Sequence, residues 1–139
     1  MQLNPIGLAS AAATFLGVWI GHVSVRRIER EVERIWIPSA LALILGSGLE
    51  LASLLAGELV VSTICGILGV TLLWDSLELG YRQPKRVQEG YAPANPKNPR
   101  HARILENYST ATTIDWLHRA PRGVPFSPEE LRSIQDQVK

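Results

Sequence analysis

The sequence predicts an all-α fold: an integral membrane bundle of three transmembrane helices, then a proline-rich cytoplasmic strap and a short helical C-terminal tail. The first observation behind this prediction is the near absence of charge from three long stretches. Residues 1–25 and 59–74 contain no Asp, Glu, Lys or Arg, and residues 35–57 contain only Glu50. A soluble domain of 139 residues would not normally hold three such stretches. The second observation is the placement of Lys and Arg, which assigns all of the basic side chains to one side of the membrane.

The membrane region is expected over residues 1–81. A bilayer core about 30 Å thick requires about 20 mostly apolar helical residues. The three predicted spans run from about 5 to 25, 35 to 57 and 58 to 79. Pro5 suits the first turn of a helix, because the N–H that proline lacks has no partner there. The third span has 16 strictly apolar residues, so either this span is short or Asp75 lies at the membrane interface.

The first span is interpreted as a retained helix and not as a cleaved signal peptide. Residues 2–25 carry no Lys or Arg, and no clear small-x-small cleavage site follows them. The first loop holds Arg26, Arg27, Arg30 and Arg34, the connection around 56–58 holds no basic residue, and the C-terminal side holds the other ten. With three spans, the first loop and the C-terminus share one face, which the basic residues identify as the cytoplasm. We therefore expect the N-terminus outside the cell.

Each predicted span carries small residues at steps of three and four, which places them on one face of a helix. Membrane helices pack through such faces, because lipid removes the hydrophobic drive between them. The candidate packing residues are Gly7, Thr14, Gly17, Gly21, Gly46, Gly66 and Gly69. These stripes predict close packing, either internal or with a partner. Trp36 and Trp74 are expected to anchor the helices at the cytoplasmic interface, where amphipathic rings are favoured.

Glu50 is the one charged residue inside the predicted second span. An acidic side chain at the centre of a membrane costs about 2.5–3.5 kcal/mol on insertion scales. At the helical rise, Glu50 lies about 22 Å from the cytoplasmic end of the span, in the outer third of the bilayer. One interpretation is a proton or cation site, or a contact for a basic residue of a partner. The other is a side chain near the outer interface, protonated or capped by Ser47 and Ser53.

The segments outside the spans have a different character. Residues 26–34 are expected to form an interfacial helix or an extension of the first helix. Residues 82–100 contain four prolines, whose spacing predicts an ordered or partner-bound strap and not a continuous helix. The tail, residues 101–139, is expected to hold a short helix around Ile104 and Leu105. It should also hold a second helix over about 128–137, which begins at a Ser-Pro-Glu-Glu motif.

Several motifs resemble those of a known family. They are Asn4-Pro5-Ile6-Gly7-Leu8, His22, Trp74-Asp75-Ser76-Leu77-Glu78-Leu79, and Arg86-Val87-Gln88-Glu89-Gly90-Tyr91 followed by Asn95-Pro96. They are similar to a family of small bacterial membrane proteins, domain of unknown function 4491, over about residues 3–100. This chain departs from the family at Val23, where proline is more usual, and at Tyr91, where tryptophan is usual. The resemblance implies three membrane helices and a cytoplasmic strap in a bacterial inner membrane. The resemblance supplies no activity, cofactor or catalytic residue that could be assigned to this chain.

The motifs of common enzymes are missing from the sequence. It has no Gly-rich phosphate loop, Cys/His cluster, Ser-His-Asp set or acidic metal motif, so we expect no enzyme and no cofactor or metal site. We expect a non-catalytic small subunit of a larger membrane complex, such as a bioenergetic one. It would bind partners and lipids through its helix faces and strap. The candidate interaction residues are Glu50, Arg82, Arg86, Gly90, Tyr91, Asn95 and Pro96.

Two alternatives stay open. The first is a homo-oligomeric ion or proton channel, or a small transporter, that uses Glu50. It would have to oligomerise, because three spans are too few for a transporter built of repeats. The second is a small membrane enzyme or a cofactor binder that contacts lipid, quinone or pigment, with His22 beside Trp19 or Trp74 as the candidate residues. Nucleic-acid binding is not expected, since the formal net charge is +1.

Overall fold

The computed structural model describes residues 3–115 and 127–137, and these residues form helices and connecting segments without any strand. The predicted all-α class is confirmed. The elements are α1 (Pro5–Glu31), α2 (Trp36–Leu55), α3 (Leu59–Leu77), the π-helix η1 (Glu78–Arg82), α4 (Gln83–Gln88), α5 (Pro99–Asn107) and α6 (Pro128–Gln137). Residues 116–126 of the predicted tail lie outside the described residues.

The chain divides into two compact units, residues 1–85 and 86–139. The first unit holds three helices that are long and apolar enough to cross a membrane: Pro5–Glu31, Trp36–Leu55 and the continuous helix Leu59–Gln88, whose last residues enter the second unit. Many of their large apolar side chains are exposed, among them Phe15, Trp19, Ile44, Leu54 and Val70. Such exposure is unfavourable in water and is ordinary for a surface that contacts lipid tails.

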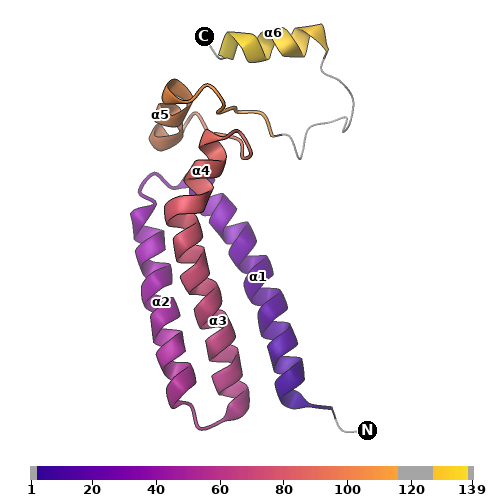
Figure 1. Ribbon diagram of the computed structural model, residues 1–139, viewed down its shortest axis with the longest axis vertical. Helices are drawn as coiled ribbons and strands as arrows, with labels where there is room; N and C mark the ends of the chain where they lie inside the picture. Colours follow the sequence, from indigo (N-terminus) through magenta and orange to yellow (C-terminus); the bar gives the residue numbers. More distant parts are fainter. Residues whose placement is uncertain (1–2, 116–126, 138–139) are drawn as a thin grey trace. The chain divides into compact units, whose positions relative to one another are not determined.

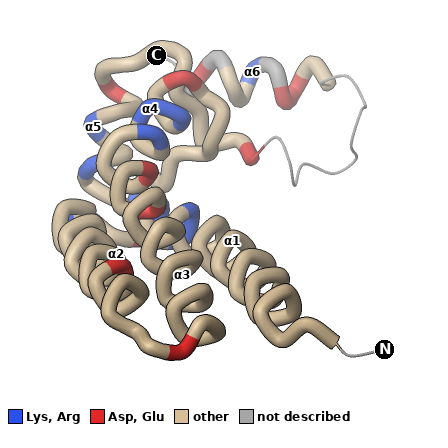
Figure 2. Tube along the Cα trace, turned by 60° about the horizontal axis from the view of Figure 1, so that its bottom comes forward, with Lys and Arg blue, Asp and Glu red and all other residues tan. Residues whose placement is uncertain are grey.

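Helix α3 lies between α1 and α2 (Figure 1). It packs along most of α2, and its C-terminal part packs on α1. The described residues therefore form a row of three helices, in which α1 and α2 each keep a broad outer face. Lys and Arg are absent from most of the length of the three helices, and in α1 they occur only near its C-terminal end, at Arg26, Arg27 and Arg30 (Figure 2).

Helix α1 includes the first part of the charged segment that follows the first span. Its N-cap is Asn4, whose side chain accepts from the backbone N–H groups of Ile6 (3.1 Å) and Gly7 (3.3 Å). Pro5 occupies the first turn. The helix then continues to Glu31, so most of the charged segment extends the first helix, which was one of the two expected arrangements.

The structure differs from the predicted strap at its beginning. The prolines predicted an irregular segment from residue 82, whereas the helix continues through Pro84 to Gln88. In a regular α-helix the ring of Pro84 would clash with the carbonyl of Gly80. The π-helix η1 contains Gly80 and ends two residues before Pro84, and its wider turn changes the spacing between the proline ring and the Gly80 carbonyl. Within the predicted strap, the irregular part is the segment between α4 and α5.

The second unit has a small core of its own, formed by Val87, Ala94, Ile104 and Ala111. Helix α5 begins at Pro99 after Asn98, whose side chain accepts from the N–H of Arg100 at 3.0 Å. Helix α6 begins with a capping box. The N–H of Ser127 donates to Glu130 Oε2 at 2.8 Å, and the N–H of Glu130 donates to Ser127 Oγ at 3.2 Å.

Candidate functional site

Two pairs of serines join α2 to α3, one pair near each end of the contact. Ser39 Oγ donates to the Ser76 carbonyl at 3.0 Å, and Ser76 Oγ donates to the Ser39 carbonyl at 2.8 Å. Ser53 and Ser62 make the same reciprocal exchange, with both bonds at 2.8 Å. The pairs are 14 residues apart in each helix, a spacing of two heptads. They fix the register of the two antiparallel helices.

Gly46 and Gly69 face each other midway between the serine pairs. A Cβ at Gly46 would lie 3.0 Å from the carbonyl oxygen of Gly69 and 2.9 Å from Leu73 Cγ. A Cβ at Gly66 would lie 2.9 Å from Ser53 Oγ. The small residues of α2 and α3 therefore bring the two backbones together, and this face is used within the chain. We call it the α2–α3 seam.

Glu50 points into the α2–α3 seam. A Cβ at Gly69 would lie 2.6 Å from Glu50 Oε1, and this oxygen is buried with no hydrogen-bond partner among the described residues. Ser53 does not cap it, contrary to one of the expected arrangements, because its hydroxyl donates to Ser62 instead. The carboxyl group thus lies against the backbone of α3 and not on the outer face of α2.

The glycines of α1 pack on α3 from the middle of α1 onward, and not in its first turns. A Cβ at Gly17 would lie 3.2 Å from Leu68 Cδ2, and one at Gly21 would lie 2.6 Å from Asp75 Oδ2. Gly7, by contrast, lies beside its own N-cap residue Asn4. Thr14, also a predicted packing residue, is exposed. Sequence spacing placed these residues on one face but did not show how far that face stays in contact.

A buried acidic pair marks the C-terminal end of α3. Asp75, in the last turn of α3, is 8% exposed, and Glu78, the first residue of the π-helix η1, is 6% exposed. Gln83 Nε2 donates to Glu78 Oε1 at 2.6 Å. Glu78 Oε2 is buried without a hydrogen-bond partner in the described part of the chain. The sequence pattern pointed to Asp75 as one possible interface residue but gave no sign that Glu78 and Gln83 form a pair. In an α-helix, side chains three or four residues apart share a face, so the spacing of five residues between Glu78 and Gln83 does not predict a contact.

Gly90 ends the long helix in the second unit. Its φ is +77°, in the left-handed region that favours glycine. The N–H of Tyr91 donates to the Arg86 carbonyl at 2.8 Å and that of Gly90 donates to the Val87 carbonyl at 3.2 Å, which is the Schellman pattern. A Cβ at Gly90 would also collide with the carbonyl oxygen of Thr110. The backbone of Tyr91 is fixed by its hydrogen bond to Arg86, whereas its side chain is 70% exposed.

Asn95 and Pro96 lie in the irregular segment before α5. The N–H of Asn95 donates to Nδ1 of His101 at 3.0 Å, and Asn95 Oδ1 accepts from the N–H of Lys97 at 3.1 Å. His101 is fully buried. The sequence pattern does not reveal this role of His101, because the contact depends on the chain folding back before α5. Pro96 is exposed and lines a cavity.

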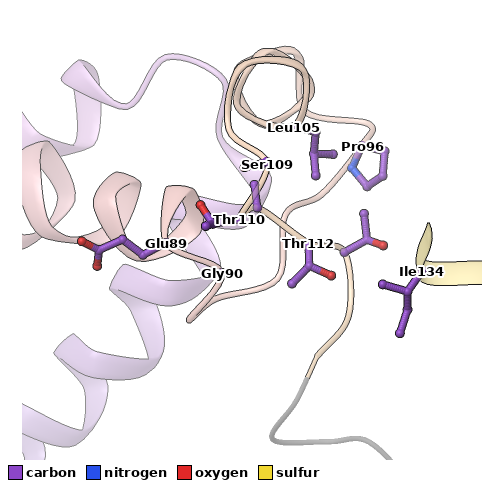
Figure 3. Close-up of a pocket in the computed structure, with 10 residues that line it drawn as sticks. Glu89, Gly90, Pro96, Leu105, Ser109, Thr110, Thr112 and Ile134 are labelled. Carbon is purple, nitrogen blue, oxygen red and sulfur yellow. The ribbon is translucent and has the colours of Figure 1, made fainter. Parts of the chain in front are cut away.

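The cavity lies in the second unit and has a volume of about 650 Å³ (Figure 3). Its lining is mostly apolar or hydroxyl-bearing and includes Gly90, Leu105, Thr110, Thr112 and, from α6, Ile134. Glu89 is the ionisable residue of the lining. This lining supplies no nucleophile with a neighbouring base. Across residues 3–115 and 127–137, no group of three or more His, Cys, Asp or Glu side chains could hold a metal ion.

The predicted anchors and Arg82 lie at one end of the first unit, and Arg86 is the first residue of the second unit. Trp36 and Trp74 are 67% and 51% exposed. Arg82 lies in the π-helix η1, and its guanidinium carbon is 5.7 Å from the centroid of the Trp74 ring. Arg86 lies in α4, where its carbonyl accepts the two bonds from Tyr91 and Ala92 that close the turn.

These features define a small helical protein with three membrane-length helices and a compact unit that follows them. The family profile named Domain of unknown function (DUF4491) matches residues 4–98, so the chain belongs to this family. The family membership predicted from the motifs is confirmed. No curated protein and no solved structure matches the chain. The matched region ends before α5, although residues beyond it complete the core around Val87 and Ala94.

Proposed function

We propose that the chain is a non-catalytic integral membrane subunit of a larger complex in a bacterial inner membrane. In this proposal the N-terminus is outside, and the second unit lies in the cytoplasm and binds a protein partner. The distribution of basic residues supports the orientation. The connection between α2 and α3 has no Lys or Arg, whereas the opposite ends of the helices carry several.

The observation that carries the proposal is the turn of residues 86–92, which we call the Tyr91 turn. A tyrosine that is 70% exposed on a backbone fixed by a Schellman pattern loses little conformational freedom on binding. Exposed aromatic side chains of this kind are frequent energetic centres of protein interfaces. The turn lies within the region matched by the family profile.

The small-residue faces of α2 and α3 are a less suitable partner surface than the sequence suggested. Ser39, Gly46 and Ser53 already contact α3 through hydrogen bonds and close backbone approach. A partner could reach them only by separating the two helices. We therefore assign partner binding to the Tyr91 turn and to the outer faces of the helices.

Affinity purification in a mild detergent tests this proposal. Tagged wild-type chain should co-elute with other subunits in fixed stoichiometry, and Tyr91→Ala should lose them. Tyr108→Ala is the matched control, because Tyr108 is a 45% exposed tyrosine in the same unit but outside the matched region. Recovery of the wild-type chain without any other subunit would contradict the proposal. Equal loss of subunits from the two variants would contradict the role of Tyr91.

One observation favours the channel alternative. Glu50 Oε1 is buried without a hydrogen-bond partner among the described residues, within the α2–α3 seam. In this alternative the chain forms a homo-oligomer whose proton or cation flux depends on Glu50. Proteoliposomes that contain the purified chain should then show flux that Glu50→Gln changes. The absence of flux with the wild-type chain would reject this alternative.

A further inference from the structure

Arg82 lies over the indole ring of Trp74 at the C-terminal end of the third membrane-length helix. The guanidinium carbon is 5.7 Å from the ring centroid, within the range of a cation–π contact. Both side chains are exposed on the surface of the first unit. In the part of the chain that the structure describes, no carboxylate pairs with Arg82. Its hydrogen-bond donors are therefore available to a ligand.

The π-helix η1 explains why these two residues meet. An α-helix turns by about 100° per residue, so residues eight positions apart would point in directions about 80° apart. The turn Glu78–Arg82 is wider and advances by a smaller angle per residue. It therefore brings Arg82 back toward the face of Trp74. A continuous α-helix would place the guanidinium beside a different part of the helix surface.

The depth of the guanidinium follows from the direction of the side chain. Helical side chains tilt toward the N-terminus of their helix, which for Arg82 is the direction of the apolar span. Trp74 and Tyr81, 51% and 70% exposed, are of the residue types that lie at the headgroup level of a bilayer. Trp36 lies at the same end of the helices, because α2 is joined there to α3 through Ser39 and Ser76. In a bilayer crossed by these helices, the Arg82 guanidinium would therefore lie at the level of the lipid headgroups.

We propose that Arg82, held over Trp74, binds the phosphate of an anionic phospholipid in the leaflet around the C-terminal end of α3. The planar guanidinium donates to two phosphate oxygens at once, and the indole fixes its orientation. The indole also contacts the apolar part of the same lipid below the phosphate. This proposal rests on the placement of α3 in a membrane and is independent of the protein partner proposed above.

Quenching of Trp74 fluorescence by brominated lipids tests the proposal. Full-length chain with Trp19, Trp36 and Trp116 changed to Phe keeps Trp74 as its one tryptophan. In detergent micelles, brominated phosphatidylglycerol should quench Trp74 at a mole fraction about fivefold lower than brominated phosphatidylcholine. Arg82→Gln should abolish this preference, and Arg82→Lys should reduce it. Arg103→Gln is the control, because Arg103 is an exposed arginine on α5 and should leave the preference unchanged.

A second measurement removes the dependence on the tryptophan substitutions. Native mass spectrometry of the chain with all four tryptophans should show phosphatidylglycerol retained in preference to phosphatidylcholine, and Arg82→Gln should lose this preference. Equal quenching and equal retention of the two lipids would overturn the proposal, and so would a preference that survives Arg82→Gln. Competition with inorganic phosphate at constant ionic strength separates lipid from free phosphate. Displacement of the lipid by millimolar phosphate would assign the site to a soluble anion and overturn the proposal.

Discussion

Gln83 donates two hydrogen bonds to Glu78 across the π-helix η1. Its backbone N–H donates to the carbonyl of Glu78, and its Nε2 donates to Glu78 Oε1 at 2.6 Å. Both side chains are more than nine-tenths buried. One residue therefore stabilises the wide turn through its backbone and the buried carboxyl group through its side chain. The same turn aligns Arg82 with Trp74.

Gln83→Ala should lower the midpoint of thermal unfolding in detergent, because it leaves a buried acceptor without its donor. The cost of such a loss is about 1–3 kcal/mol. The double variant Glu78→Met, Gln83→Met should be more stable than Gln83→Ala, since it removes both members of the buried polar pair. If Gln83→Ala unfolded at the wild-type temperature, the bond between the two side chains would contribute nothing to stability.

Gly90→Ala should destabilise the second unit. The residue has a φ of +77°, which costs a non-glycine residue about 1–2 kcal/mol, and the new Cβ would also collide with the carbonyl oxygen of Thr110. Limited proteolysis should cleave residues 86–115 faster in this variant than in the wild type. Gly57→Ala is the control, because a Cβ there meets nothing within 4 Å. Equal cleavage rates for Gly90→Ala and wild type would contradict the Schellman turn.

Gly46→Leu and Gly48→Leu should differ in thermal stability, although the two glycines are two positions apart in α2. A side chain at Gly46 would meet Leu73 and the backbone of Gly69 at 2.9–3.0 Å, so α2 and α3 would have to separate. A side chain at Gly48 meets nothing within 4 Å and would contact lipid. The midpoint of thermal unfolding should fall for Gly46→Leu and stay constant or rise for Gly48→Leu. Equal midpoints would contradict the α2–α3 seam.

Cysteine pairs should reveal the register of α2 and α3. The hydroxyl oxygens of Ser39 and Ser76 are 3.2 Å apart, and those of Ser53 and Ser62 are 3.4 Å apart. In a chain with Cys65→Ala, each of these pairs changed to cysteine should form a disulfide under mild oxidation. The pair at 39 and 62 should not, because its members lie at opposite ends of the seam. Cross-linking can be followed by thiol alkylation and mass measurement, and a disulfide between 39 and 62 would contradict the register.

The sequence by itself determined the helical class, the three membrane-length segments and the family. These properties depend on features that are local in the sequence. They are the length of an uncharged stretch, the spacing of small residues and a motif such as Asn95-Pro96. A span needs enough apolar residues in a row, whatever lies beside it. The N-caps at Asn4 and Asn98 are also local features, because each side chain accepts from backbone N–H groups two or three residues further along the chain.

The tertiary structure decided which groups those residues meet. Ser53 could have capped Glu50 but donates to Ser62, because α3 brings a closer acceptor to it. Pro84 could have ended the helix but is accommodated after a π turn, which the buried pair Glu78 and Gln83 supports. His101 is buried against Asn95 because the chain reverses between them. Each outcome depends on which groups lie within hydrogen-bond or packing distance. Only the tertiary structure shows which groups these are.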